Sequence, residues 1–196
     1  MKTPEERHRW HLGEHAGNAV CVVTALVWVC AAIAPATAGA EAPPAAAQLA
    51  FLNPFQLIDD QRSITAFRLS ILHGANRDMR GFDLAAGTTR TEGMLRGLQL
   101  AGANEVNGDC TGMQVGVFVN YVEGRLSGVQ LSGLAAYSGQ GTGVQIASVM
   151  ARAKKLRGFQ FALVTVAEEM TGLQLGLLNF NTKGFLPVFP LFNFGR

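Results

Sequence analysis

Few side chains in this sequence have the types and spacing needed for catalysis or for metal binding. Past residue 40 the chain has one histidine, His73, and one cysteine, Cys110, too few for a zinc site or an internal disulfide. Glu168 and Glu169 are adjacent, and adjacent side chains on an extended strand point to opposite faces, which makes them a poor acid–base pair. The sequence therefore predicts a protein that is not an enzyme and that uses no metal or cofactor.

A short basic run is the first candidate contact site. It could bind anionic lipid headgroups or lipopolysaccharide phosphates, or it could be a solvated turn that limits aggregation. The formal net charge of the whole chain is only +2, far below the dense positive charge of nucleic-acid-binding proteins. We therefore expect an envelope protein, a glycan or a lipid headgroup as partner, and no nucleic acid. The run consists of Arg152, Lys154, Lys155 and Arg157.

The second candidate is a series of glutamines that recur every 14–16 residues. Each stands between two apolar residues, as in Leu98-Gln99-Leu100, and this alternation predicts a strand with one buried face. With the aliphatic side chains inside, the glutamines would form a flat outer face that offers hydrogen bonds to a partner. In the same column Asp83 should stack beside Arg68 as a surface pair. The predicted binding face comprises Gln99, Gln114, Gln130, Gln145, Gln160 and Gln174.

The glutamines belong to an internal repeat of about 15 residues, found eight times between residues 66 and 184. Within each repeat, positions 2 and 4 are apolar, position 3 is the glutamine column, and position 5 is small. The second half carries asparagines and turn glycines, and one apolar residue such as Leu126 returns just before the next repeat. Every repeat except the first begins with glycine: Gly81, Gly97, Gly112, Gly128, Gly143, Gly158 and Gly172.

These repeats predict an all-β fold, a β-solenoid of about eight 15-residue coils with a cap at each end. The alternative is that each repeat is a β-hairpin, which would give a β-meander or a small β-barrel. Residues 51–65 would cap the N-terminal end, and residues 185–196 would form a hydrophobic cap at the C-terminal end. Pro187 and Pro190 in that last segment argue against a paired strand there.

The N-terminus has the order of a secretory signal peptide. A polar start with basic residues precedes an apolar run at residues 19–34, and small residues follow at Ala38 and Ala40. The run has 16 residues, fewer than the ~20 that span a bilayer. We expect residues 1–40 to be removed on export and residues 41–50, rich in Ala and Pro, to be a flexible lead-in.

The repeat GLQLGLLN at residues 172–179 and the ending GFLPVFPLFNF at residues 184–194 resemble a family of exported surface-repeat proteins of Gram-negative bacteria. The resemblance covers residues 51–196. It implies a location in the periplasm, at the outer membrane or on the cell surface, and it brings no catalytic residues.

The predicted function is a non-catalytic structural or binding module of the envelope that acts through its glutamine face. The alternative is a small outer-membrane β-barrel or a membrane-associated β protein acting as an anchor or pore; the oligomeric state stays open.

Overall fold

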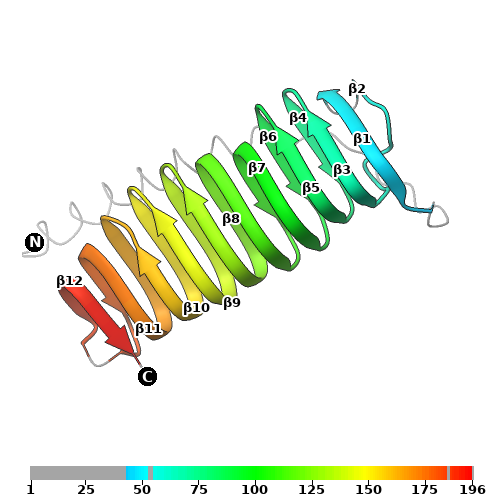
Figure 1. Cartoon of the computed structure of the whole chain (residues 1–196). Coiled ribbons are helices and arrows are strands. Elements are labelled where there is room, and N and C mark those ends of the chain that lie inside the picture. Colours follow the sequence, from blue (N-terminus) through cyan, green and yellow to red (C-terminus); the bar gives the residue numbers. More distant parts are fainter. Residues whose placement is uncertain (1–42, 53–54, 185, 196) are drawn as a thin grey trace, which may run out of the picture. The chain divides into compact units, whose positions relative to one another are not determined.

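A computed structural model describes residues 43–52, 55–184 and 186–195. In these ranges the chain forms twelve strands joined into one continuous sheet, which winds as a stack of coils from β1 to β12 (Figure 1). The predicted signal peptide, residues 1–40, lies outside the described residues. The strands are β1 Ala45–Leu52, β2 Phe55–Gln56, β3 Ile64–Ser70, β4 His73–Asn76, β5 Met79–Ala85, β6 Thr88–Thr91, β7 Leu95–Val106, β8 Cys110–Ser132, β9 Ala135–Ala147, β10 Met150–Phe161, β11 Val164–Asn181 and β12 Val188–Gly195.

Successive coils pair in parallel, with equivalent repeat positions side by side. Gly128 aligns with Gly143, Gly143 with Gly158, and Gly158 with Gly172. A hairpin array would instead give antiparallel pairs, because consecutive strands joined by tight turns run in opposite directions. The predicted β-solenoid is therefore confirmed over the hairpin alternative.

The leading glycine of each repeat bends the strand where no other residue fits. Gly128 has a φ of 144°, a conformation that L-residues rarely adopt. A Cβ built on Gly128 would lie 1.9 Å from the carbonyl oxygen of Gly112 on the preceding coil. Glycine at this position thus allows both the bend and the close approach of neighbouring coils.

The predicted placement of the two faces is wrong: the glutamines point inward and the large apolar side chains beside them point outward. Gln130 is fully buried, whereas Leu173 is 38% exposed and Phe161 is 49% exposed. The small residues of position 5 also point inward, so this wall of the coil is thin enough to pack closely against the opposite one. The position two residues before the first residue of a repeat supplies the aliphatic interior, with Ile64, Met79, Leu95, Cys110, Leu126, Leu156 and Met170 buried.

The N-terminal end begins earlier than the sequence predicted. Residues 45–52, expected in part as a flexible lead-in, form β1, which pairs in parallel with β3 and aligns Gln48 with Arg68. Gln48 is fully buried and is therefore an additional member of the interior polar column. The short strand β2 pairs antiparallel with β1 at the end of the stack. Residues 41 and 42 of the expected lead-in lie outside the described residues.

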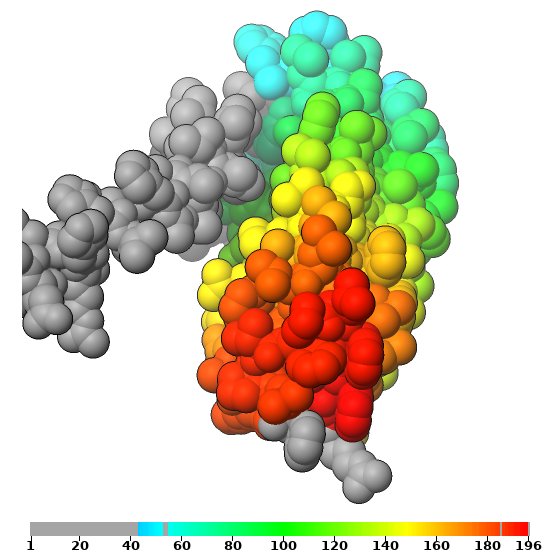
Figure 2. Space-filling view, turned by 90° about the vertical axis from the view of Figure 1, so that its left-hand side faces the viewer, coloured from blue at the N-terminus to red at the C-terminus, as the bar shows by residue number. Residues whose placement is uncertain are grey.

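At the C-terminal end β12 pairs antiparallel with β11. Figure 2 views the stack from this end, where the last strands cover the face toward the viewer. The prediction that prolines keep this segment out of a paired strand is wrong, since Pro190 lies inside β12. Proline is tolerated there because β12 is the outermost strand of the sheet and needs hydrogen bonds on one side only.

Candidate functional site

The six repeat glutamines form one hydrogen-bonded ladder through the interior of the solenoid. The Nε2 of each donates to the Oε1 of the glutamine on the preceding coil, from Gln174 back to Gln99, over 2.7–2.9 Å. Some amides also donate across the interior, as Gln145 does to the Ser138 hydroxyl at 3.0 Å. Because these amides are buried and committed to one another, they are not the binding face that the sequence predicted.

The ladder ends on a buried ion pair. Gln99 Nε2 donates to Asp83 at 2.8 Å, and Asp83 accepts two hydrogen bonds from the guanidinium of Arg68, one of them from Nε at 2.8 Å. Arg68 and Asp83 are both fully buried. The predicted pairing of these residues is confirmed, but its predicted place on the surface is wrong. Each amide of the ladder donates one hydrogen bond in the direction of the carboxylate, and Arg68 neutralises that charge.

A second series of hydrogen bonds, made by asparagine side chains, supports the wall of the coil opposite the glutamine ladder. Asn104 Nδ2 donates to Asn120 Oδ1 at 2.7 Å, and Asn120 Nδ2 donates to the backbone carbonyl of Leu131 at 2.7 Å. The second of these bonds satisfies a backbone carbonyl near a corner of the coil, as the asparagines of the repeat suggested. The interior is therefore held by side-chain amides as much as by aliphatic packing.

The residues that could do chemistry are not brought together. Burial raises the pKa of the Cys110 thiol to about 12, so that thiol stays neutral at physiological pH. His73 Nδ1 lies 2.7 Å from the Thr88 hydroxyl, and burial, with the nearby charges of Arg68 and Arg90, lowers the pKa of the imidazole. In the part of the chain that the structure describes, no three His, Cys, Asp or Glu side chains are grouped to hold a metal ion.

The four side chains of the basic run are all exposed and lie along β10. Arg152 aligns with Tyr137 and Val166, whereas Arg157 aligns with Thr142 and Thr171, further along β10. Lys155 lies 3.3 Å from Glu169, and these contacts with Lys155, together with Lys183, lower the pKa of that carboxyl. The run is thus spread along one strand, and one of its charges is already compensated.

The most prominent surface is an apolar face, which the sequence predicted to lie in the interior. It begins at Leu49 on β1, passes through all eight repeats, and ends at Phe192 on β12. Ten rungs about 4.8 Å apart make it about 43 Å long, and with a width of about five residues its area is on the order of 700 Å². Position 2 contributes Phe67, Phe82, Leu98, Met113, Val129, Val144, Phe159 and Leu173. Position 4 contributes Leu69, Leu84, Leu100, Val115, Leu131, Ile146, Phe161 and Leu175.

The apolar face widens at the corner that follows it. Val117 is 64% exposed and Phe118 is 55% exposed, and equivalent residues such as Leu163 and Leu177 are also exposed. The largest apolar patch on a typical monomeric protein covers about 300–600 Å², so this face exceeds what a free surface usually carries. The sequence held no signal for it, because the alternation shows which residues share a face but not which face lies inside.

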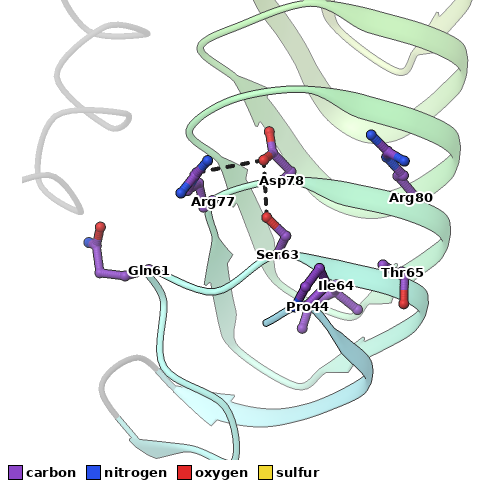
Figure 3. A pocket seen from close by; sticks show the side chains of 8 residues that line it. All are labelled: Pro44, Gln61, Ser63, Ile64, Thr65, Arg77, Asp78 and Arg80. Carbon is purple, nitrogen blue, oxygen red and sulfur yellow. Dashed lines mark hydrogen bonds and ion pairs between the residues drawn. The ribbon is translucent and has the colours of Figure 1, made fainter. Parts of the chain in front are cut away.

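A shallow polar hollow of about 240 Å³ lies near the N-terminal end, and Thr65 and Arg80 are among the residues that line it. Its central carboxylate already has partners: Asp78 accepts a hydrogen bond from the Ser63 hydroxyl at 3.0 Å (Figure 3). It accepts another from the Met94 backbone N–H. Arg77 Nε lies 3.7 Å from the same carboxylate. The hollow therefore offers no uncommitted group to a small ligand at its centre.

No helix among the described residues is long and apolar enough to cross a membrane. The chain matches no protein-family model, no curated protein and no solved structure. The resemblance to exported surface-repeat proteins therefore stays a prediction, and the surfaces of the solenoid are the basis for any functional conclusion.

Proposed function

We propose that this chain is an exported, non-catalytic binding module that attaches to the surface of a membrane through its apolar face. The single observation that carries this proposal is a continuous row of outward-facing Phe, Leu, Val and Ile side chains along the whole stack. Transferring such a face from water to an apolar phase is favourable by roughly 25 cal/mol per Å². A face of this size supplies ample free energy for attachment without crossing the bilayer.

The interior of the fold supports the same interpretation. Glutamines and asparagines hold the coils together from inside, so the large apolar side chains are not needed for the core. Exposed apolar residues at equivalent positions on every coil have no role in the isolated chain, and they favour aggregation unless something covers them. A lipid surface covers a long flat row of this kind without requiring shape complementarity.

We expect the purified protein to co-float with lipid vesicles and a variant with two charges in the apolar face to lose that binding. Leu131 and Ile146 are aligned on neighbouring coils. In L131D/I146D we expect vesicle partitioning to fall about tenfold or more, since each carboxylate must be dehydrated at the lipid surface. The matched control is Q140D, which places a charge at an exposed position outside the apolar face.

The proposal fails if the wild-type protein stays with the aqueous fraction for both neutral and anionic vesicles. It also fails if L131D/I146D and Q140D reduce flotation equally. Circular dichroism of each variant reports whether its strand content is intact.

A further inference from the structure

The apolar face has one charged edge, and that edge carries a single sign of charge. The position directly before the first residue of each repeat points outward beside the apolar columns. It is occupied by an arginine or a hydroxyl residue in every repeat, with no acid among the described residues. We call this row the arginine edge; it consists of Thr65, Arg80, Arg96, Thr111, Ser127, Thr142, Arg157 and Thr171.

The three arginines of this edge share one local arrangement. Each is followed by the bent glycine and then by an outward apolar residue, as in Arg80-Gly81-Phe82 and Arg157-Gly158-Phe159. Arg80, Arg96 and Arg157 are all exposed. None of the three forms an ion pair with an acidic side chain among the described residues. Arg96 Nε donates to Met94 Sδ at 2.8 Å, which leaves its terminal nitrogens, like the guanidinium groups of Arg80 and Arg157, available to an anion at the margin of the apolar face.

Two of these arginines are direct neighbours. Arg80 aligns with Arg96 on the next coil, so their backbones are separated by one strand spacing, about 4.8 Å. Like charges placed opposite each other on paired strands destabilise a sheet. An anion bound between the two would remove that repulsion. Figure 3 places Thr65 and Arg80 on adjoining rungs, on the same side of the coil and away from Asp78; the Thr65 hydroxyl itself donates to the Ala45 backbone carbonyl at 3.1 Å.

The positions of the acidic side chains indicate what kind of partner supplies the anion. From the arginine edge across the apolar columns to the row that contains His73 and Val119, no outward-facing described residue is acidic. The exposed acids, such as Glu92, Asp109, Glu123 and Glu168, lie on the other sides of the coil. A second copy of this chain docked face to face, in either orientation, would therefore bring no acidic side chain to the arginine edge. Lipids with phosphate headgroups supply acyl chains for the face and negative charge for the edge.

We infer that the arginine edge selects anionic lipids by binding their headgroup phosphates while the apolar face contacts the acyl chains. This inference rests on the proposed attachment to membranes and names the lipid class. Guanidinium groups suit phosphate because their donors match its oxygens in pairs. The selection should be sensitive to salt, because the arginines are exposed and their interactions are screened.

The test is flotation with vesicles of phosphatidylcholine alone and with vesicles in which about one third is phosphatidylglycerol. We expect the wild-type protein to prefer the anionic vesicles by on the order of 100-fold, as three arginines near such a surface allow. R80Q/R96Q/R157Q should lose most of this preference and keep its binding to neutral vesicles. R80K/R96K/R157K should retain much of it. The control R125Q/K154Q/K155Q removes the same charge from another row and should retain the preference.

The outcomes separate this inference from the proposed function. Equal binding of the wild-type protein to both vesicles overturns the lipid selection and leaves membrane attachment standing. An equal loss of preference in R80Q/R96Q/R157Q and R125Q/K154Q/K155Q overturns the assignment to the arginine edge, because net charge alone would then explain it. Absence of binding to either vesicle overturns both proposals.

Discussion

Replacing Asp83 by alanine should destabilise the protein by about 3–5 kcal/mol. The variant leaves the guanidinium of Arg68 buried and without its counter-charge, and it removes the acceptor of Gln99 at the end of the ladder. Chemical denaturation followed by circular dichroism measures the loss as a lower midpoint of unfolding. The effect should be among the largest of any single substitution in this chain, because an uncompensated charge then remains in the interior.

The matched variant is R68Q/D83Q, which replaces the ion pair by two amides. Both positions lie in the glutamine column, aligned with Gln48 on one side and Gln99 on the other. We expect its free energy of unfolding to lie within about 1 kcal/mol of wild type, because replacing a buried ion pair as a whole is often neutral. A double variant as unstable as D83A would contradict this explanation, and so would D83A with wild-type stability.

The second large effect concerns a pair of neighbouring residues with opposite roles. Q130A should destabilise the protein by about 3–5 kcal/mol, because it leaves a cavity and removes both ladder bonds, to Gln114 and from Gln145. L131A should cost about 1 kcal/mol or less, since Leu131 points outward and is only half-buried. The order of the two effects is the reverse of what hydrophobicity alone would give.

The same unfolding measurement compares the two variants. The order of their unfolding midpoints can be read without assuming a single two-state transition across all coils, which repeat proteins need not obey. If L131A lost more stability than Q130A, the leucine would be the core residue and the inward orientation of the glutamines would be wrong.

The repeat pattern was sufficient to predict the coils but not their orientation. Glycines at spacings of 14–16 residues predicted where each coil begins. The alternation around Gln99 correctly placed its two neighbours on the opposite face of the strand. Period-two alternation says which residues share a face, but not which face is inside. The apolar face was predicted to lie in the interior because burying an isolated amide is costly. That cost disappears in the solenoid, since each amide is paired with the same residue one coil away.

The charged residues illustrate the same limit. The neighbours Arg68 and Asp83 could be paired from the sequence, because equal repeat positions stack, yet their burial could not. The arginine edge was not recognised because Arg80, Arg96 and Arg157 are about 15 or 60 residues apart and form a row only once the register is known. The basic run at residues 152–157 was conspicuous in sequence, but one strand spreads it over different rows.

The most direct test of the buried ladder is the exchange rate of the glutamine side-chain amide protons in the wild-type protein, measured by NMR after transfer to D₂O. We expect strong protection for Gln99, Gln114, Gln130, Gln145, Gln160 and Gln174, and rapid exchange for the exposed Gln61 and Gln140. If the six ladder amides exchange as fast as Gln61 and Gln140, the glutamines face the solvent, and both the buried ladder and the outward apolar face are wrong.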